Sequence, residues 1–224
     1  LGGMGDACRT LNTPVTGGNV SFYNENPKGA VFPTPTIGML GLIEDVDAHH
    51  TTPSFKKAGD VVIYAGAARK GLGGSEYLSF IHGKTAGDAP EIDLAFESNL
   101  QSALLTAIQN GLVASAHDCS DGGLMIALFE KAIHGGLGAK LDLSSLGEIN
   151  AELCFSEAQS GVLLTVAEDK ATELMNHLHK ADIPAYQLGK VQEGKALEIN
   201  SLSFNVDELR KTYEGVIPGV MDRN

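Results

Sequence analysis

A short stretch near the start of the sequence combines two glycines with an amide and a hydroxyl. In TPVTGGNVSFYN at 13–24, Asn19 and Ser21 follow Gly18, and they share one face of an extended chain because successive side chains alternate. Glycine lets main-chain amides approach phosphate oxygens, the Asn oxygen suits a hard cation, and the hydroxyl suits a polar substrate. These residues therefore suggest a nucleotide site. A hairpin or bulge that uses Gly and Asn for its geometry is the alternative.

A second candidate site is AHDCSDGG at 116–123, where a predicted strand ends and a predicted helix begins. The carboxylates of Asp118 and Asp121, with Ser120 between them, could hold magnesium, and the amides that follow could face an anion. Alternatively, Ser120 or Asp121 is simply the N-cap of the helix. Both interpretations stay open, since two Asp residues exceed the need of one cap. His117, beside Asp118, is the one histidine within this motif.

Two further polar stretches are interpreted structurally. KGLGGSEY at 70–77 matches neither the Walker pattern nor the dinucleotide fingerprint, so we expect a flexible connection with Glu76 near the start of a helix. ELCFSEAQSG at 152–161 places Glu157 and Gln159 before the apolar run VLLTV. A ligand pair is conceivable there, but an ordinary polar turn is the favoured interpretation.

The elements that position these motifs alternate along the chain. Besides strands at 13–24 and 34–46, the patterns predict strands over 60–66, 137–143, 151–155, 161–166 and 185–191, and helices over 93–109, 122–133, 169–180 and 206–215. Asp93 and Asn205 are expected N-caps of two of these helices. The strand at 34–46 is almost continuously apolar and is expected to be buried on both faces or at an interface. The interleaving of strands and helices predicts an α/β (α+β) fold.

Composition and charge exclude several classes of protein. The chain has 224 residues, 43% apolar and 20% charged, and its 16 basic against 28 acidic residues give a net charge of −12. This charge argues against nucleic acid or an anionic membrane surface as a partner. The three cysteines form no CxxC pair, so neither a disulfide framework nor a zinc site is indicated, and no apolar run approaches the roughly 18 residues of a membrane span. A cytoplasmic protein is expected.

The polar segment DAHHTTPSFKKAGD at 47–60 is broken by proline and glycine, and we expect a linker there. It separates the carboxy-terminal part of one domain at 1–50 from an α+β domain at 58–192, which a tail at 193–224 follows. The opening LGGMGDACRTLN at 1–12 reads as the last turns of a helix whose start is absent, so we expect the chain to be a fragment.

The motifs PVTGGNVSFYNE, PTPTIGMLGLIEDV, GGSEY, HDCSDGGL and FSEAQSGVLLTV, in this order, resemble the second half of the phosphoribosylformylglycinamidine synthase family, small-type synthetase subunit. This family belongs to a superfamily that includes aminoimidazole ribonucleotide (AIR) synthetase. The resemblance covers nearly the whole chain. It implies part of an AIR synthetase-like amino-terminal domain, followed by an AIR synthetase-like carboxy-terminal domain.

The resemblance also implies a function. The family's enzyme is an ATP-dependent ligase of purine biosynthesis that converts formylglycinamide ribonucleotide and glutamine-derived ammonia to formylglycinamidine ribonucleotide. By resemblance, Gly18 contacts ATP, Asn19 binds Mg²⁺ and Ser21 contacts the ribonucleotide. The family's catalytic histidines and acidic magnesium ligands lie in the first half of the polypeptide, so this piece alone is expected to be inactive. The implied partners are that missing half, a glutaminase subunit and a small bridging subunit.

Other roles stay open beside this one. In larger members of the family, residues equivalent to Asp118 and Ser120 line an auxiliary nucleotide site, so the chain could be a non-catalytic half that holds structural nucleotide and docks subunits. Another ATP-dependent kinase or synthetase of the superfamily is a further alternative. Ala158 and Gly161 stand where relatives often have Ser and Arg, which lowers the expectation that this turn binds substrate. The apolar residues within 13–46 predict self-association or partner binding.

Overall fold

The computed structural model describes residues 1–19, 24–67 and 70–221. The described residues form a sheet in the order β4-β6-β3-β7-β5-β8-β9. The strands are β3 Val61–Gly66, β4 Ser115–Asp118, β5 Gly138–Leu141, β6 Gly161–Val166, β7 Ala185–Gln192, β8 Ala196–Ile199 and β9 Leu202–Asn205. All neighbours pair antiparallel except β5 and β8, which are parallel. The predicted α/β class is confirmed.

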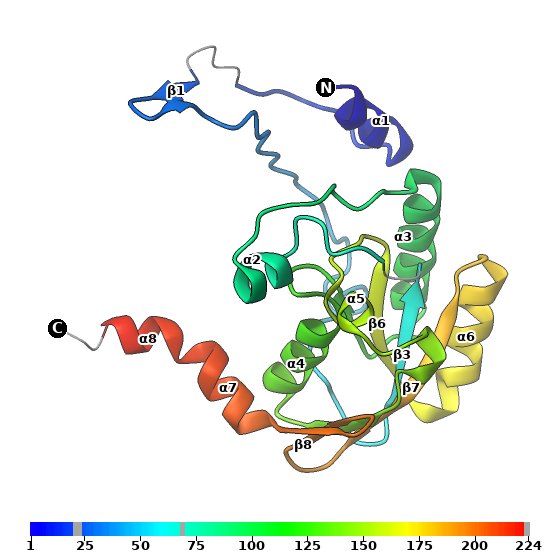
Figure 1. Ribbon diagram of the computed structural model, residues 1–224. Helices are drawn as coiled ribbons and strands as arrows, with labels where there is room; N and C mark the ends of the chain where they lie inside the picture. Colours follow the sequence, from blue (N-terminus) through cyan, green and yellow to red (C-terminus); the bar gives the residue numbers. More distant parts are fainter. Residues whose placement is uncertain (20–23, 68–69, 222–224) are drawn as a thin grey trace.

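Helices cover both faces of this sheet (Figure 1). On one face lie α3 Leu94–Gln109 and α6 Ala171–Lys180. On the other lie α4 Gly123–Gly135, α5 Ala151–Phe155 and α7 Val206–Glu214. Helices α1 Gly2–Thr10, α2 Glu76–His82 and α8 Val216–Met221, and the 3₁₀ turns η1 Ser144–Leu146 and η2 Glu168–Lys170, complete the described helices. Among the described residues, none of these helices has the length and apolar content to cross a membrane.

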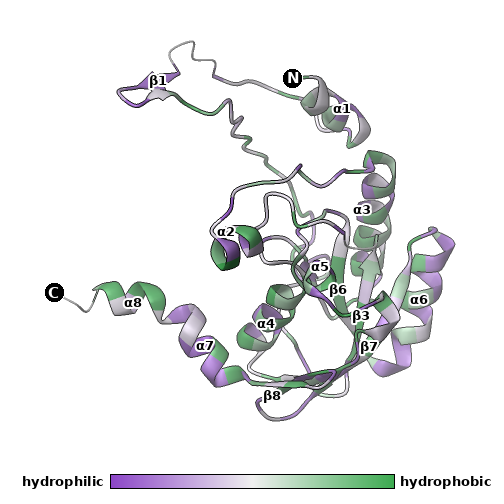
Figure 2. Ribbon diagram, in the orientation of Figure 1, coloured by the Kyte–Doolittle hydropathy of each residue, from purple (hydrophilic) through white to green (hydrophobic). Residues whose placement is uncertain are grey.

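Strand β3 lies in the interior of the sheet, and all six of its residues are buried. Val61, Ile63 and Ala65 belong to the core cluster under α3 and α6. Val62 and Tyr64 belong to the cluster under α4, because side chains alternate between the two faces of a strand. Both faces of β3 therefore exclude water, and Figure 2 shows the neighbouring strand β6 largely in the hydrophobic colour.

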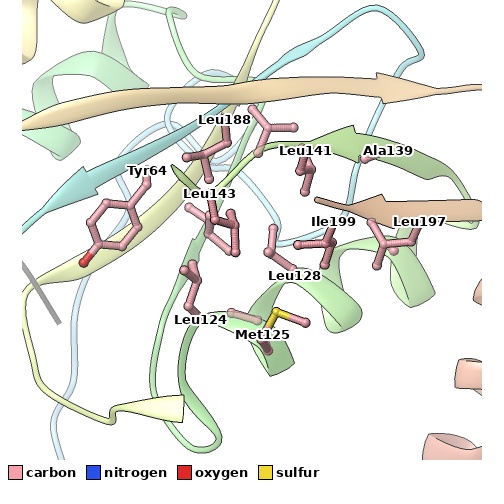
Figure 3. Close-up of a cluster of buried hydrophobic side chains, with 14 of the residues drawn as sticks. Tyr64, Leu124, Met125, Leu128, Ala139, Leu141, Leu143, Leu188, Leu197 and Ile199 are labelled. Atoms are coloured by element: carbon pink, nitrogen blue, oxygen red, sulfur yellow. The ribbon is translucent and has the colours of Figure 1, made fainter. Parts of the chain in front are cut away.

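Helix α4 forms the larger core with the sheet. Its side chains Leu124 and Leu128 face Leu141 and Leu188 of β5 and β7 (Figure 3). All four side chains are buried. The apolar character of α4 on most sides, expected from sequence, follows from its position between the sheet, α5 and α7.

The expected N-caps are confirmed. Asp93 Oδ1 accepts hydrogen bonds from the amides of Ala95 and Phe96, both at 3.0 Å, and α3 begins at the next residue. Asn205 Oδ1 accepts from Asp207 N at 2.9 Å and from Glu208 N at 3.1 Å, which starts α7. These side chains satisfy amides that have no partner within the helix.

The strand predicted over 151–155 is wrong, because this segment is helix α5. Asn150 Oδ1 accepts a hydrogen bond from Leu153 N at 3.0 Å and so caps a helical turn. A five-residue apolar segment is too short for its periodicity to separate the two structures. The cap, rather than the apolar pattern, decides the local structure here.

The strands predicted over 13–24 and 34–46 are not formed by the described residues. Residues 13–19 and 31–43 have no regular structure, and only β1 Glu25–Asn26 and β2 Gly29–Ala30 make a short ladder. A lone strand leaves its amides and carbonyls unpaired, and no described segment lies beside these residues as a partner strand. Residues 20–23 lie outside the described residues.

The apolar side chains of this part are exposed, contrary to the expected burial. We call residues 1–50 the arm; none of its described residues is buried. The large apolar side chains from 31 to 46 have exposed fractions between 46% and 101%; they are Val31, Phe32, Ile37, Met39, Leu40, Leu42, Ile43 and Val46. An interface as the place of this segment remains a prediction.

The expected linker is a packed segment in the structure. Phe55 is buried, Thr51 Oγ1 donates to Ala114 O at 3.0 Å, and Ala116 N donates to Thr52 O at 3.3 Å. Residues 51–53 therefore lie along the outer side of β4, the edge strand of the sheet. The predicted tail at 193–224 contributes β8, β9 and α7 to the fold, since β8 pairs with β5. The domain boundaries themselves stay a prediction.

One lysine lies inside the core. Lys131 of α4 has no exposed surface, and burial lowers the pKa of its amine to about 7, with Cys119 acting against this shift and Lys56 adding to it. The pKa in the unfolded chain is near 10.5, so above about pH 7 the unfolded state binds more protons. Stability should therefore rise as the pH increases from about 7 towards 10.5, and below this window the contribution is constant.

We expect the difference in free energy of unfolding between wild type and Lys131→Met to grow by about 2 kcal/mol, in favour of wild type, from pH 7 to about pH 9. Urea unfolding of both proteins across this range measures the difference. A difference that stays constant with pH would show that Lys131 titrates alike in both states.

Candidate functional site

Three loops lie at the same end of the strands β3, β4 and β6. Gly66, the last residue of β3, pairs with Gly161 at the start of β6, and Asp118 at the end of β4 pairs with Val162. The loop after β3, the loop after β4 and the loop before β6 are therefore neighbours where they join the sheet. We call them the three-loop edge, with described residues 70–75, 118–122 and 156–160. The structure thus brings together GGSEY, HDCSDGGL and FSEAQSG.

Glu157 connects the three loops. Its Oε1 accepts a hydrogen bond from Gly122 N at 2.8 Å and another from Glu76 N at 2.9 Å. These two amides stand at the starts of α4 and α2, where main-chain amides lack helical partners and a negative charge is favoured. The favoured interpretation of Glu157 as part of an ordinary polar turn missed this role.

Further contacts tie the first loop to α5. Ser156 is buried, and its hydroxyl donates to Lys70 O at 3.0 Å. Glu152 Oε1 accepts from Gly71 N at 2.6 Å. Ser75 caps α2, which begins at Glu76 as expected. The stretch expected to be a flexible connection is thus held at several points.

The start of α4 differs from both proposed caps. The N-cap is Gly122 rather than Ser120 or Asp121. Gly122 and Gly123 have φ of 74° and 68°, and a Cβ on Gly123 would lie 2.6 Å from Ser156 O. Glycine is needed here for the left-handed backbone and for the close approach of two loops. The carboxylate of Glu157 replaces the missing side-chain cap.

The side chains of Asp118 and Ser120 are exposed at the three-loop edge. His117 is turned inward: its Nε2 lies 3.1 Å from Glu130 Oε2, and its Nδ1 lies 2.7 Å from Asp118 O. Tyr213 donates to Glu130 at 3.0 Å, and this bond raises the pKa of the Tyr213 phenol. His117 therefore joins β4 to α4 and, through Glu130, to α7. The described residues contain no group of three His, Cys, Asp or Glu able to hold a metal, and a magnesium site at 118–121 stays a prediction.

Gly18 and Asn19 lie in the exposed arm. A Cβ on Gly17 or Gly18 would meet no atom within 4 Å, and neither glycine has a φ in the left-handed region. The roles of Gly18 and Asn19 stay predictions. Ser21 lies outside the described residues.

Two hollows lie away from these residues. One of about 590 Å³ is bounded by α1 and the chain that follows it, up to Val15. The other, of about 460 Å³, lies near β8, β9 and the start of α7. Neither is lined by Gly18, Asn19, Asp118 or Ser120.

The role of Glu157 can be tested by removing its carboxylate. Glu157→Ala leaves Gly122 N and Glu76 N without their acceptor and should lower the free energy of unfolding by about 1–2 kcal/mol, whereas Gln keeps an acceptor and should cost about half as much. Chemical denaturation measures both. Gln159→Ala, an exposed change in the same loop, is the control and should be near neutral. Equal effects at 157 and 159 would contradict the role.

The fold and the three-loop edge define a class of protein. The family model described as AIR synthase related protein, C-terminal domain, matches residues 57–200, which include β3 to β8. This match covers more than half of the chain. The chain belongs to the AIR synthase related family.

A more particular similarity is to phosphoribosylformylglycinamidine synthase subunit PurL of Alkaliphilus metalliredigens. The two sequences are 40% identical over 229 residues, which cover 98% of this chain and 30% of the relative. This finding confirms the resemblance to phosphoribosylformylglycinamidine synthase. The chain spans less than a third of the length of this curated relative.

Solved structures of Thermotoga maritima PurL share the fold. The complex with FGAR aligns with a TM-score of 0.62 at 23% identity, over 71% of this chain and 29% of that one. The complex with ATP gives 0.58 at 21% identity, over 72% and 27%. The PurLQS structure from the same organism gives 0.57 at 20% identity, over 71% and 27%.

Proposed function

We propose that this chain is part of a phosphoribosylformylglycinamidine synthase, the ATP-dependent ligase that converts formylglycinamide ribonucleotide and glutamine-derived ammonia to formylglycinamidine ribonucleotide in purine biosynthesis. The observation that carries the proposal is the 40% identity to a PurL subunit across 98% of the chain. Since the chain spans 30% of that relative, the activity belongs to the assembled synthase. This chain contributes contacts to it rather than the catalytic histidines.

The proposed contacts are in the arm. Gly18 approaches ATP, Asn19 gives one oxygen to Mg²⁺, and Ser21 contacts the ribonucleotide. The exposure of Gly18 and Asn19 and the open space around the glycines support this, because a main chain without neighbours can be approached by phosphate. Bound Mg²⁺ would neutralise phosphate charge. Asn19 fits one ligand position, and phosphate oxygens, water and the rest of the synthase would supply the others.

The proposed partners are the rest of the synthase polypeptide, a glutaminase subunit and a small bridging subunit. The structural likeness to a chain of the PurLQS assembly and the exposed apolar side chains between 31 and 46 support this. On its own the chain should associate through those side chains. A cytoplasmic place of action is part of the proposal and agrees with the three free cysteines.

A second candidate function is a structural nucleotide site at the three-loop edge. Asp118 and Ser120 are exposed there, next to the glycines that begin α4. In this case the chain would hold nucleotide for stability and dock subunits, with no part in turnover.

Asn19→Ala in the complete synthase distinguishes the two. If Asn19 holds the metal, turnover should fall by about 10- to 100-fold with unchanged thermal stability, because ligand-shell changes act at this scale. Asn176→Ala on the exposed face of α6 is the matched control and should leave both unchanged. Unchanged turnover in Asn19→Ala, with lower stability in Asp118→Ala that added nucleotide no longer restores, would favour the structural site instead.

A further inference from the structure

Lys131 joins three segments of the chain from inside the core. Its Nζ donates to Pro53 O at 2.9 Å, to Ser115 Oγ at 2.8 Å and to Leu163 O at 3.4 Å. The side chain has no exposed surface. When the amine is protonated, its three donors meet acceptors from the 51–57 segment, from β4 and from β6, which is the arrangement that a buried cation requires.

The 51–57 segment is also held by its main chain. Phe55 N donates to Lys131 O at 3.0 Å, and the Phe55 ring centroid lies 5.6 Å from the amine. A Cβ on Gly135, one turn further along α4, would lie 2.4 Å from Phe55 O. The segment therefore lies close against α4 at Phe55.

The arm has little else to fix it. None of its described residues is buried, and among its elements α1 lies beside α3 of the sheet domain (Figure 1). The direction in which the arm leaves the domain is consequently set at residues 51–57. A segment with this role would need a specific anchor, and the hydrogen bonds of Lys131 to Pro53, Ser115 and Leu163 provide one.

We propose that residues 51–57 form a fixed joint between the arm and the sheet domain, and that Lys131 is its anchor. The joint goes beyond the proposed function and needs no ligand. Only one consequence rests on that function: a fixed joint would set the point at which the arm that carries Gly18 and Asn19 leaves the sheet domain.

The test is amide hydrogen exchange of the 224-residue chain without nucleotide. Lys131→Met keeps the aliphatic stem and removes the donors, so the amides of Phe55 and Ala116 should exchange about tenfold faster or more, while Ile63 in β3 keeps its rate. Lys170→Met is the matched control, because Lys170 also donates to a main-chain oxygen, at 2.9 Å from Gly111 O, but is exposed. It should leave the joint unchanged.

Unchanged exchange rates at Phe55 and Ala116 would overturn the proposal. An equal acceleration at Ile63 would also overturn it, because it would mean a general loss of stability. If Lys131→Met does not fold, Ser115→Ala decides, because it removes one acceptor and should accelerate the same two amides selectively. Exchange is measured without substrate, so its outcome is independent of whether Asn19 acts in turnover.

Discussion

Gly66→Ala is expected to lower the free energy of unfolding by about 4 kcal/mol, because it combines backbone strain with steric overlap. Gly66 has a φ of 132°, and a Cβ there would lie 2.0 Å from Ser160 O. This oxygen cannot retreat freely, since it accepts a hydrogen bond from Ala67 N at 2.9 Å. Relief would require the β3–β6 ladder to separate at the three-loop edge.

Gly38→Ala is the matched control for this change. Gly38 has no atom within 4 Å of its ideal Cβ and no left-handed φ, so the substitution should change stability by less than about 0.5 kcal/mol. Urea unfolding, followed by circular dichroism, compares the two variants. A Gly66→Ala protein as stable as wild type would mean that the two loops approach less closely than the structure shows.

Leu128→Ala should cost about 3–5 kcal/mol, because it leaves a cavity in the core between α4 and the sheet. The Leu128 side chain has no exposed surface and packs among the buried side chains around Leu143 and Ile199 (Figure 3). Differential scanning calorimetry or denaturant unfolding measures the loss. A cost below about 1 kcal/mol would show that the core relaxes around the gap.

Leu40→Ala is the same chemical change at a side chain that is 101% exposed. It should leave stability within about 0.5 kcal/mol of wild type, and analytical ultracentrifugation should show weaker self-association if the arm mediates it. Association that persists at wild-type strength in this variant and in a matching change at Leu42 would place the contact elsewhere.

The sequence predicts those elements whose stabilising features are local. The buried strand β3 is predicted by a continuous apolar run, and the starts of α3 and α7 are predicted by the caps Asp93 and Asn205. Helix α5 is missed because five residues carry no period. The two strands expected in the arm are missed for another reason: a strand needs a partner, and none lies beside them among the described residues.

The same difference between local and long-range features applies to the candidate site. The sequence identifies the motifs of the three-loop edge, but it does not reveal that they meet. Glu157 joins amides 81 and 35 residues away, and an acceptor of main-chain amides at such separations has no sequence signature. Lys131 likewise has acceptors that come from distant segments of the chain. The roles of Gly18, Asn19 and Ser21 rest on the resemblance and stay predictions.

The packing of residues 51–53 along β4 limits how this sheet can be extended. An incoming peptide finds a free strand only at β9, among the described strands of the sheet, and β9 is four residues long before the chain turns into α7. Such a short strand offers few main-chain hydrogen bonds to an added strand, so fibril growth by strand addition is disfavoured. Any tendency of the chain to precipitate should therefore come from the exposed apolar side chains of the arm rather than from the backbone of the sheet.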